Sequence, residues 1–315
     1  MKKSFFFMIA VAMIATQLGI GALAQSRVEH GLNNAGQVDG ASLFGPTLRG
    51  GRAATTGGTT STTALVNHGG PVMNTPKIYI IWYGNWNQTN GSDTPAGQQI
   101  VRDWAANIGN SAHFRLNSSY PPTNSISGLV SFGGETTDTG TSKRLSDANI
   151  KTIVTNSISS GRLPKDTTGV YFVLTSSDVT ASSGFCTQYC GWHTHATISG
   201  SDIKYSFVGN AKRCITSCAA QSTVSPNGNP GVDGAISVIT HELEEATSDP
   251  DLNAWYDASG AENADKCAWT FGHFQYTTAN GSFANMHLGN RDYLIQRNLW
   301  YSGSSWLCMV DSTHN

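Results

Sequence analysis

All six cysteines of this chain lie in its second half. Four of them form two C-x3-C segments and two stand alone: Cys186, Cys190, Cys214, Cys218, Cys267 and Cys308. An even number of cysteines in an exported chain is typical of disulfides. We expect the pairs Cys186–Cys190, Cys214–Cys218 and Cys267–Cys308, with cross-pairing of the first four left open. A zinc site of four thiolates is the alternative, which an oxidising compartment disfavours.

The N-terminus predicts export. Lys2 and Lys3 precede an apolar stretch at residues 5–20 and the small-residue segment 22–24 (Ala-Leu-Ala), a pattern typical of a signal peptide cleaved after residue 24. A membrane anchor would need about 20 unbroken apolar residues, and residues 16–17 (Thr-Gln) interrupt this stretch. We therefore expect a secreted protein, extracellular or periplasmic, with no stable membrane anchor.

Charge is scarce throughout the chain. Only 13% of the 315 residues are charged, and the formal net charge is -2. This composition excludes disorder driven by excess charge and offers no basic surface for nucleic acid. The sequence carries no indication of the oligomeric state.

The order of predicted elements favours one α/β (α+β) domain at residues 70–315, after a signal peptide at 1–24 and a flexible arm rich in Gly and Thr at 25–69. We expect strands at residues 77–84, 126–132, 170–175 and 204–208, and helices at residues 95–108, 146–160 and 233–247. Strands that alternate with helices indicate a mixed sheet covered by helices. Residues 182–229 are rich in turn residues and contain four cysteines, so we expect an irregular lobe tied by disulfides.

The segment at residues 233–247 carries the most informative motif. Apolar residues recur at spacings of three and four, which predicts an amphipathic helix with Asp233 as its N-cap. His241 and Glu245 are four residues apart, so their side chains project from one face and can hold one ion. Glu242 is the next residue. The pattern is similar to the H-E-x-x-H motif of zinc hydrolases, with His241 and Glu245 as ligands and Glu242 as the general base toward water.

The clustering of glutamates favours a metal site over a chance match. The chain has six glutamates, and four of them lie within 21 residues of His241. Their mutual repulsion would be relieved by a cation. The alternative interpretation is a solvated acidic helix face next to a histidine with a structural role.

A zinc site of this type needs a third protein ligand. Glu262 is the candidate, because it follows a turn in a way that resembles the returning carboxylate of thermolysin-like enzymes. Asp265 is the candidate for orienting His241 from behind the ligands. Asp257 and Asp249 are weaker alternatives for the third ligand. We expect one divalent metal ion, with zinc preferred and calcium, manganese and magnesium left open.

His193 and His195 form a second candidate pair, since alternate residues of a strand face the same side. A loop between disulfides more often carries histidines for hydrogen bonding, so we expect ligation here to be the weaker hypothesis.

Several segments in the same order resemble the EXORDIUM, or phosphate-induced protein, family of exported proteins. The matching stretches include residues 68–71 (His-Gly-Gly-Pro), 170–178, 184–191, 208–210 and 237–245 (Ser-Val-Ile-Thr-His-Glu-Leu-Glu-Glu), followed by Asn253-Ala-Trp-Tyr256, Glu262, Asp265 and Cys267. The resemblance spans residues 68–310. It implies an extracellular protein, linked in plants to growth and cell expansion, and it supplies no reaction.

These observations lead to two hypotheses. In the first, a zincin-like domain uses the ion and Glu242 to hydrolyse a peptide or similar acyl bond. In the second, the protein is not an enzyme, and aromatic loops bind cell-wall glycans.

Overall fold

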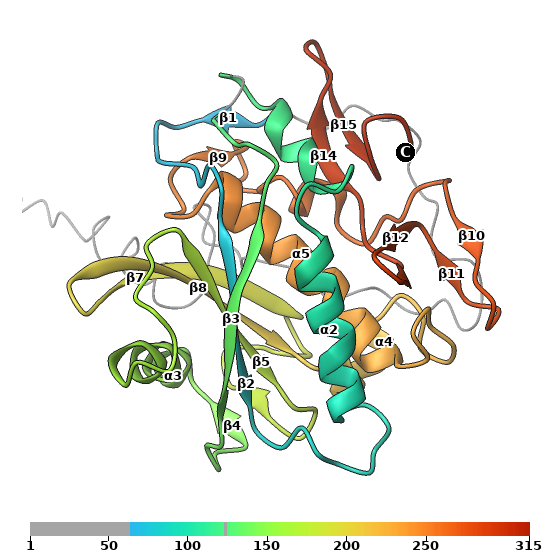
Figure 1. Cartoon of the computed structure of the whole chain (residues 1–315). Coiled ribbons are helices and arrows are strands. Elements are labelled where there is room, and N and C mark those ends of the chain that lie inside the picture. The colour runs from blue at the N-terminus through green and yellow to red at the C-terminus, as the bar shows by residue number, and fades with distance from the viewer. Residues whose placement is uncertain (1–63, 123–124) are drawn as a thin grey trace, which may run out of the picture.

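A five-stranded mixed sheet with the strand order β3-β2-β5-β8-β7 forms the centre of the protein. The computed structural model describes residues 64–122 and 125–315 (Figure 1). The strands are β2 (Lys77–Tyr83), β3 (Ser131–Asp138), β5 (Gly169–Thr175), β7 (Gly191–Ile198) and β8 (Ser201–Gly209). β3, β2, β5 and β8 run parallel, whereas β7 is antiparallel to β8 at one edge. This mixed sheet with its helices confirms the expected α+β class.

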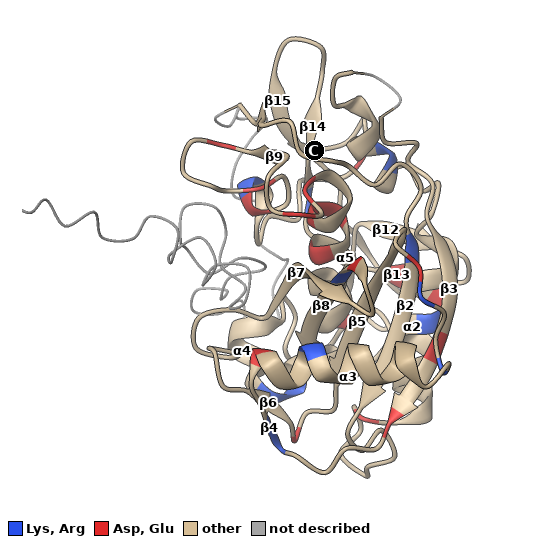
Figure 2. Ribbon diagram, turned by 90° about the vertical axis from the view of Figure 1, so that its left-hand side faces the viewer, with Lys and Arg blue, Asp and Glu red and all other residues tan. Residues whose placement is uncertain are grey.

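Helices cover both faces of the sheet, as Figures 1 and 2 show: α3 (Asp147–Ser159) lies on one face, and α2 (Pro95–Asn107) and α5 (Pro230–Ser248) lie on the other. Every residue of β5 is buried, as is every residue of β2 except the first. Parallel strands that are covered on both faces are apolar along their whole length, which is why the sequence reveals them clearly.

Local capping sets the starts of α2 and α3. The Thr94 side chain accepts a hydrogen bond from the Gly97 amide at 3.0 Å, and a proline occupies the first turn of α2 as predicted. Ser146 and Asn149 form a reciprocal capping box at the start of α3.

The start and the environment of α5 differ from the prediction. The helix begins at Pro230, and the Asn229 side chain caps it by accepting from the Val232 amide at 3.2 Å. Asp233 lies inside the helix, where its carboxylate accepts from Ser225 and Asn227 instead. The helix is also not amphipathic, because residues 231–248 are all buried. The sheet packs on one side of α5, while η1 and segments near the C-terminus pack on the other.

One predicted strand was misplaced, and one strand of the central sheet was not predicted. β3 begins at Ser131 and not near residue 126, and its residues are mostly half-buried because it pairs only with β2 at the second edge of the sheet. The expected irregular lobe contains β7 and a longer β8, which complete the central sheet. The sequence did not predict β7 because several of its residues are polar. Its backbone pairs with β8, and the strand packs against α5.

Short elements fill the rest of the described chain. The remaining strands form five two-stranded sheets: β1 (Val66–Asn67) with β9 (Trp255–Tyr256), β4 (Arg144–Leu145) with β6 (Thr180–Ala181), β10 (Tyr276–Thr277) with β11 (Phe283–Ala284), β12 (Met286–Leu288) with β13 (Arg291–Tyr293), and β14 (Asn298–Tyr301) with β15 (Trp306–Met309). The short helices are η1 (Phe114–Ser119), η2 (Ala211–Cys214), α4 (Ile215–Cys218) and η3 (Asp265–Cys267). A second, smaller apolar cluster includes Tyr120, Trp255 and Trp306.

The disulfides are Cys186–Cys214, Cys190–Cys218 and Cys267–Cys308, with none of the cysteines free. The third pair is as expected, whereas the two local pairs are wrong. The segment before β7 lies beside η2 and α4, so each cysteine of one C-x3-C segment reaches a cysteine of the other. With all six sulfurs bonded, the alternative of a zinc site of four thiolates is also excluded.

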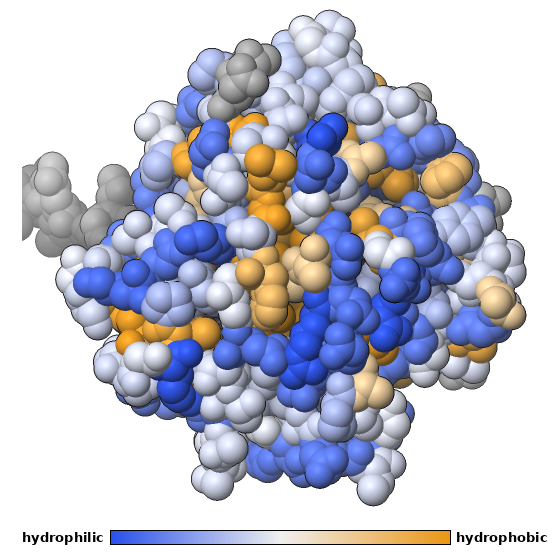
Figure 3. All heavy atoms as spheres, in the orientation of Figure 1, coloured by the Kyte–Doolittle hydropathy of each residue, from blue (hydrophilic) through white to orange (hydrophobic). Residues whose placement is uncertain are grey.

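The expected signal peptide and most of the arm lie outside the described residues. From residue 64 onward the chain already joins the fold, since β1 pairs with β9. Among the described helices, none is both long and apolar enough to cross a bilayer. Figure 3 shows a surface that is hydrophilic over most of one face, with smaller apolar areas between.

Candidate metal centre

α5 brings three side chains of the predicted motif into the interior. His241 Nε2 lies 2.8 Å from Glu245 Oε1, one helical turn along the same face, as their spacing predicts. Glu242 is buried beside them, and His241, Glu242 and Glu245 provide atoms close enough to surround one ion.

The burial of these glutamates excludes the solvated-face interpretation. Glu242, Glu244 and Glu245 are all 0% exposed. Moving a carboxylate out of water costs several kcal/mol unless it is paired or bound to a cation. The acidic stretch of α5 is therefore a feature of the interior that requires a compensating partner.

β7 and the loop after β9 contribute the other side of the centre. His193 Nε2 lies 3.2 Å from Glu262 Oε2 and 3.9 Å from Glu245 Oε2. His193, Glu245 and Glu262 form a second group able to surround an ion, and all three are buried. The predicted third ligand, Glu262, thus lies at the centre, but it is grouped with His193 and not with His241.

His193 is the residue that the sequence prediction undervalued. The pattern His-Thr-His at residues 193–195 was the available signal for a ligand, but it suggested that both histidines bind the same ion. In the structure the His193 and His195 rings belong to two different groups. His195 Nδ1 lies 2.8 Å from Asp202 Oδ1 in a different group that includes Asp251. The Lys204 ammonium is 2.5 Å from Asp202 and 3.1 Å from Asp251, so a lysine already supplies the positive charge there.

Asp265 and Gln296 contact His241 from different sides. Asp265 Oδ1 is 3.6 Å from His241 Nε2, the nitrogen that faces Glu245, and the Asp265 amide donates to Glu245 Oε1 at 3.1 Å. Asp265 therefore lies on the ligand side of the ring and not behind it as expected. The Gln296 side chain contacts Nδ1, and its backbone amide donates to Ser237 Oγ at 3.1 Å. Gln296 is distant in sequence and belongs to no motif, so sequence reasoning had no signal for it.

The two alternative third ligands have other partners. Asp249 accepts from the amides of Asn253 and Ala254 at 2.6 and 2.5 Å. Burial raises the pKa of Asp249 to about 6, although these two amides and, to a smaller extent, a hydrogen bond with Glu262 oppose this shift. Asp257 is held by Lys266 and by amides of its own turn. Asp249 thus borders the centre, whereas Asp257 is engaged elsewhere.

The protonation of the two histidines differs. Burial, together with the neighbouring His241 and His195 rings, lowers the pKa of His193 to about 3, so this imidazole is neutral as ligation requires. Burial disfavours the charged form of His241, but the Glu245 carboxylate and neighbouring acids raise its pKa well above the ordinary value. Burial and the carboxylates of Asp265 and Glu242 also raise the pKa of Glu245, against the opposing effect of His241. The carboxylates around His241 therefore favour a positive charge at this position.

The donor set fits a divalent transition metal. Ligands of a tetrahedral ion with bonds of about 2.1 Å lie about 3.4 Å apart, and the contacts between these histidines and glutamates range from 2.8 to 3.9 Å. Mixed imidazole and carboxylate ligands favour zinc or manganese over calcium, which prefers oxygen alone.

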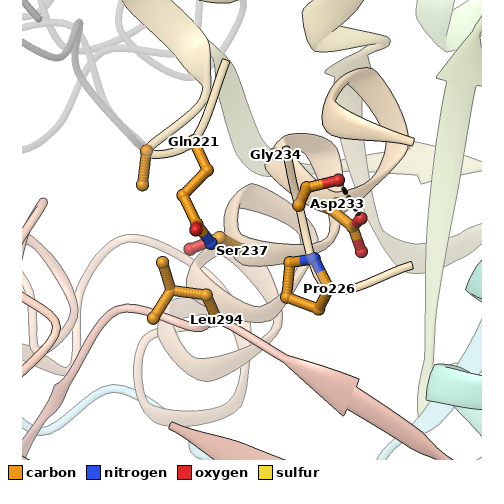
Figure 4. Close-up of a pocket in the computed structure, with 8 residues that line it drawn as sticks. Gln221, Pro226, Asp233, Gly234, Ser237 and Leu294 are labelled. Carbon is orange, nitrogen blue, oxygen red and sulfur yellow. Dashed lines mark hydrogen bonds between the residues drawn. The ribbon is translucent and has the colours of Figure 1, made fainter. Parts of the chain in front are cut away.

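Neither of two hollows in the described part of the chain is lined by these ligands. The first is lined by Gln221, Asp233, Ser237 and Leu294 one to two turns before His241, and Figure 4 shows these side chains around it. Its volume of about 10 Å³ is sufficient for a single water. The second measures about 390 Å³ and lies between the end of α2, β12 and residues 310–311.

The phosphate-induced protein 1 conserved region matches residues 65–296. The chain belongs to the phosphate-induced protein 1 family. Among relatives of this family, it is 31% identical to Protein EXORDIUM-like 3 of Arabidopsis thaliana over 76% of this chain and 81% of that protein. It is 24% identical to Protein EXORDIUM of the same plant, over 70% of this chain and 80% of that protein. No solved structure matches.

This membership and the three disulfides fit an extracellular protein. The matched region of the phosphate-induced protein 1 family contains His193, His241, Glu245 and Glu262, so the candidate centre lies within the part of the chain that defines the family.

Proposed function

We propose that this chain is an exported, zincin-like protein that holds a divalent metal ion beside Glu245 and hydrolyses a peptide or similar acyl bond. The observation that carries the proposal is the meeting of two histidines and three glutamates from α5, β7 and the loop after β9, all at most 1% exposed. Zinc is the preferred ion. Export through a signal peptide at residues 1–24 is part of the proposal.

Each residue has a distinct role in this mechanism. Glu245 would hold the ion, with His241 beside one of its oxygens and with His193 and Glu262 beside the other. The bound ion supplies Lewis acidity for the scissile carbonyl. Glu242 takes a proton from the attacking water and later delivers it to the leaving group. A Cβ at Gly191 would lie 3.1 Å from Glu242 Oε1. The absence of a side chain at this position of β7 therefore leaves space for the Glu242 carboxylate.

The substitution Glu242→Gln tests the chemistry apart from the metal. Protein secreted by an exporting host should contain zinc by elemental analysis and cleave members of a peptide library. Glu242→Gln should retain the metal and lose cleavage, while Glu135→Gln, a matched change on β3, should alter neither. Absence of any divalent metal after repletion would contradict the proposal, as would unchanged cleavage by Glu242→Gln.

A second candidate function, binding of cell-wall glycans, is favoured by the larger hollow. Its volume lies within the range of small-molecule sites. Phe274 lines it with 44% of its surface exposed, and its ring stacks on His314 at 4.2 Å between centroids. Side chains of Asn107 and Asp311 supply polar groups at the rim. An exposed ring next to amide and carboxylate groups suits a sugar unit.

Retention on insoluble wall polysaccharides tests this candidate. Phe274→Ala should abolish retention without changing the metal content if the hollow binds glycans. Equal retention of Phe274→Ala and the unmodified protein would contradict glycan binding in this hollow.

A further inference from the structure

The two oxygens of Glu245 face two different histidines. Oε1 is 2.8 Å from His241 Nε2, while Oε2 is 3.9 Å from His193 Nε2. The rings come from different elements, α5 and β7, so the Glu245 carboxylate lies between two separate sets of donors. A carboxylate in this position can bind one ion through each oxygen.

Each side of Glu245 has enough donors for an ion of its own. On the first side, His241 Nε2 lies 2.8 Å from Glu245 Oε1 and 3.6 Å from Asp265 Oδ1, and Glu242 provides a further atom close enough for the same ion. On the second side, His193 Nε2 is 3.2 Å from Glu262 Oε2, and Glu245 completes the group.

The charge of the cluster also exceeds what one ion balances. Glu242, Glu245 and Glu262 are wholly buried, and Asp265 approaches His241 from the same side as Glu245. One divalent ion balances two carboxylates, whereas two ions balance four. In a protein interior, which screens charges weakly, two carboxylate charges left without a balancing cation would be costly in free energy.

We propose that the centre holds two divalent ions bridged by the Glu245 carboxylate. The first ion is bound by His241, Glu245 and Asp265, and the second by His193, Glu245 and Glu262. Pairs of this type lie about 3.5–4 Å apart and position both the attacking and the leaving oxygen of a substrate. This inference rests on the proposed function, because it requires that a metal bind beside Glu245.

Metal stoichiometry of single variants provides the test. After repletion with zinc or manganese, the secreted protein should hold about two ions per chain. His193→Ala and Asp265→Asn should each hold about one, and Glu245→Gln should hold none. His195→Ala is the matched control: it lies on the same strand in the group that contains Lys204, and it should retain both ions.

Electron paramagnetic resonance of the unmodified protein loaded with manganese is a second measurement that needs no variant. Two bridged ions give the spectrum of an exchange-coupled pair, and one ion gives the six lines of isolated manganese. An isolated spectrum, or one ion that both His193→Ala and His241→Ala lose completely, would overturn the bridged pair and leave the single-ion proposal intact. Absence of any bound metal would overturn both.

Discussion

His113 Nε2 lies 2.9 Å from Glu244 Oε1, and both side chains are buried. Glu244 is the residue before Glu245, so α5 directs one glutamate to the candidate metal centre and its neighbour to a histidine that precedes η1. The other nitrogen of this ring, Nδ1, lies 2.6 Å from the Val310 carbonyl oxygen. The ring therefore connects α5 to the C-terminal residues through both of its nitrogens.

This contact predicts that stability falls as the pH rises. Burial lowers the pKa of His113, but the Glu244 carboxylate and the Val310 carbonyl outweigh this effect and raise the pKa above 6.5. A histidine whose pKa is raised by folding stabilises the folded protein at pH values below the ordinary histidine pKa. This stabilisation is lost as the pH rises through the pKa of the folded state. Thermal unfolding should show a melting temperature that decreases above pH 6.5, and His113→Gln should reduce that decrease. A decrease of equal size in His113→Gln would contradict this assignment.

Removal of the His113 imidazole should lower the free energy of unfolding at any pH near neutral. His113→Ala leaves the Glu244 carboxylate buried without its partner, which costs about 3–5 kcal/mol in comparable buried pairs. Urea unfolding measures this loss. His287→Ala is the control, since His287 is exposed and pairs only with Asp292 nearby, and it should change stability by less than about 1 kcal/mol.

Gln296 should tune the metal affinity without being a ligand. It contacts the Nδ1 atom of His241, and loss of such a partner typically weakens metal binding 10–100-fold. Competition with a chromophoric chelator should show this decrease for Gln296→Ala and no change for Gln99→Ala on α2. Complete loss of metal from a folded Gln296→Ala protein would instead make Gln296 essential to the site.

Gly191→Ala should disturb the packing of β7 on α5. The new Cβ would lie 2.6 Å from Val238 Cγ1, which is closer than real contacts allow, and also near Glu242. We expect a lower melting temperature and weaker metal binding. The double variant Gly191→Ala/Val238→Ala should lose less stability than the sum of its single changes, because the second change makes room for the first. Strict additivity would exclude this clash as the cause.

The disulfides can be tested by digestion with trypsin under non-reducing conditions. Cleavage after Lys204 and Arg213 separates the two C-x3-C segments in the sequence. With the pairs Cys186–Cys214 and Cys190–Cys218, the two peptides remain joined until a reductant is added. Recovery of two separate peptides without reduction would instead support the local pairs Cys186–Cys190 and Cys214–Cys218.

The elements that were predicted correctly are those set by residues close together in the sequence. β2 and β5 are long apolar runs, and α2 begins at Pro95 beneath a threonine cap. The one-turn relation of His241 to Glu245 follows from helix geometry alone. These features need no information from distant parts of the chain.

The features that the sequence did not predict depend on distant contacts. β7 is polar and becomes a strand only through β8 and α5, so His193 looked like a loop residue. Gln296 reaches His241 across the interior, and its residue type carries no functional signal. α5 is buried on all sides by segments from earlier and later parts of the chain. The periodicity of apolar residues within the helix cannot predict these contacts.

The enclosure of α5 has a consequence for biosynthesis. Its covering comes from strands made earlier, namely β5, β7 and β8, and from residues made near the end of translation, since the Gln296 amide donates to Ser237 Oγ. Gln296, the partner of the His241 ring, is also a late residue. A nascent chain therefore cannot assemble this interior until almost all of it has left the ribosome. Under the proposed function, the candidate centre would take its metal from the compartment in which the exported chain completes its folding.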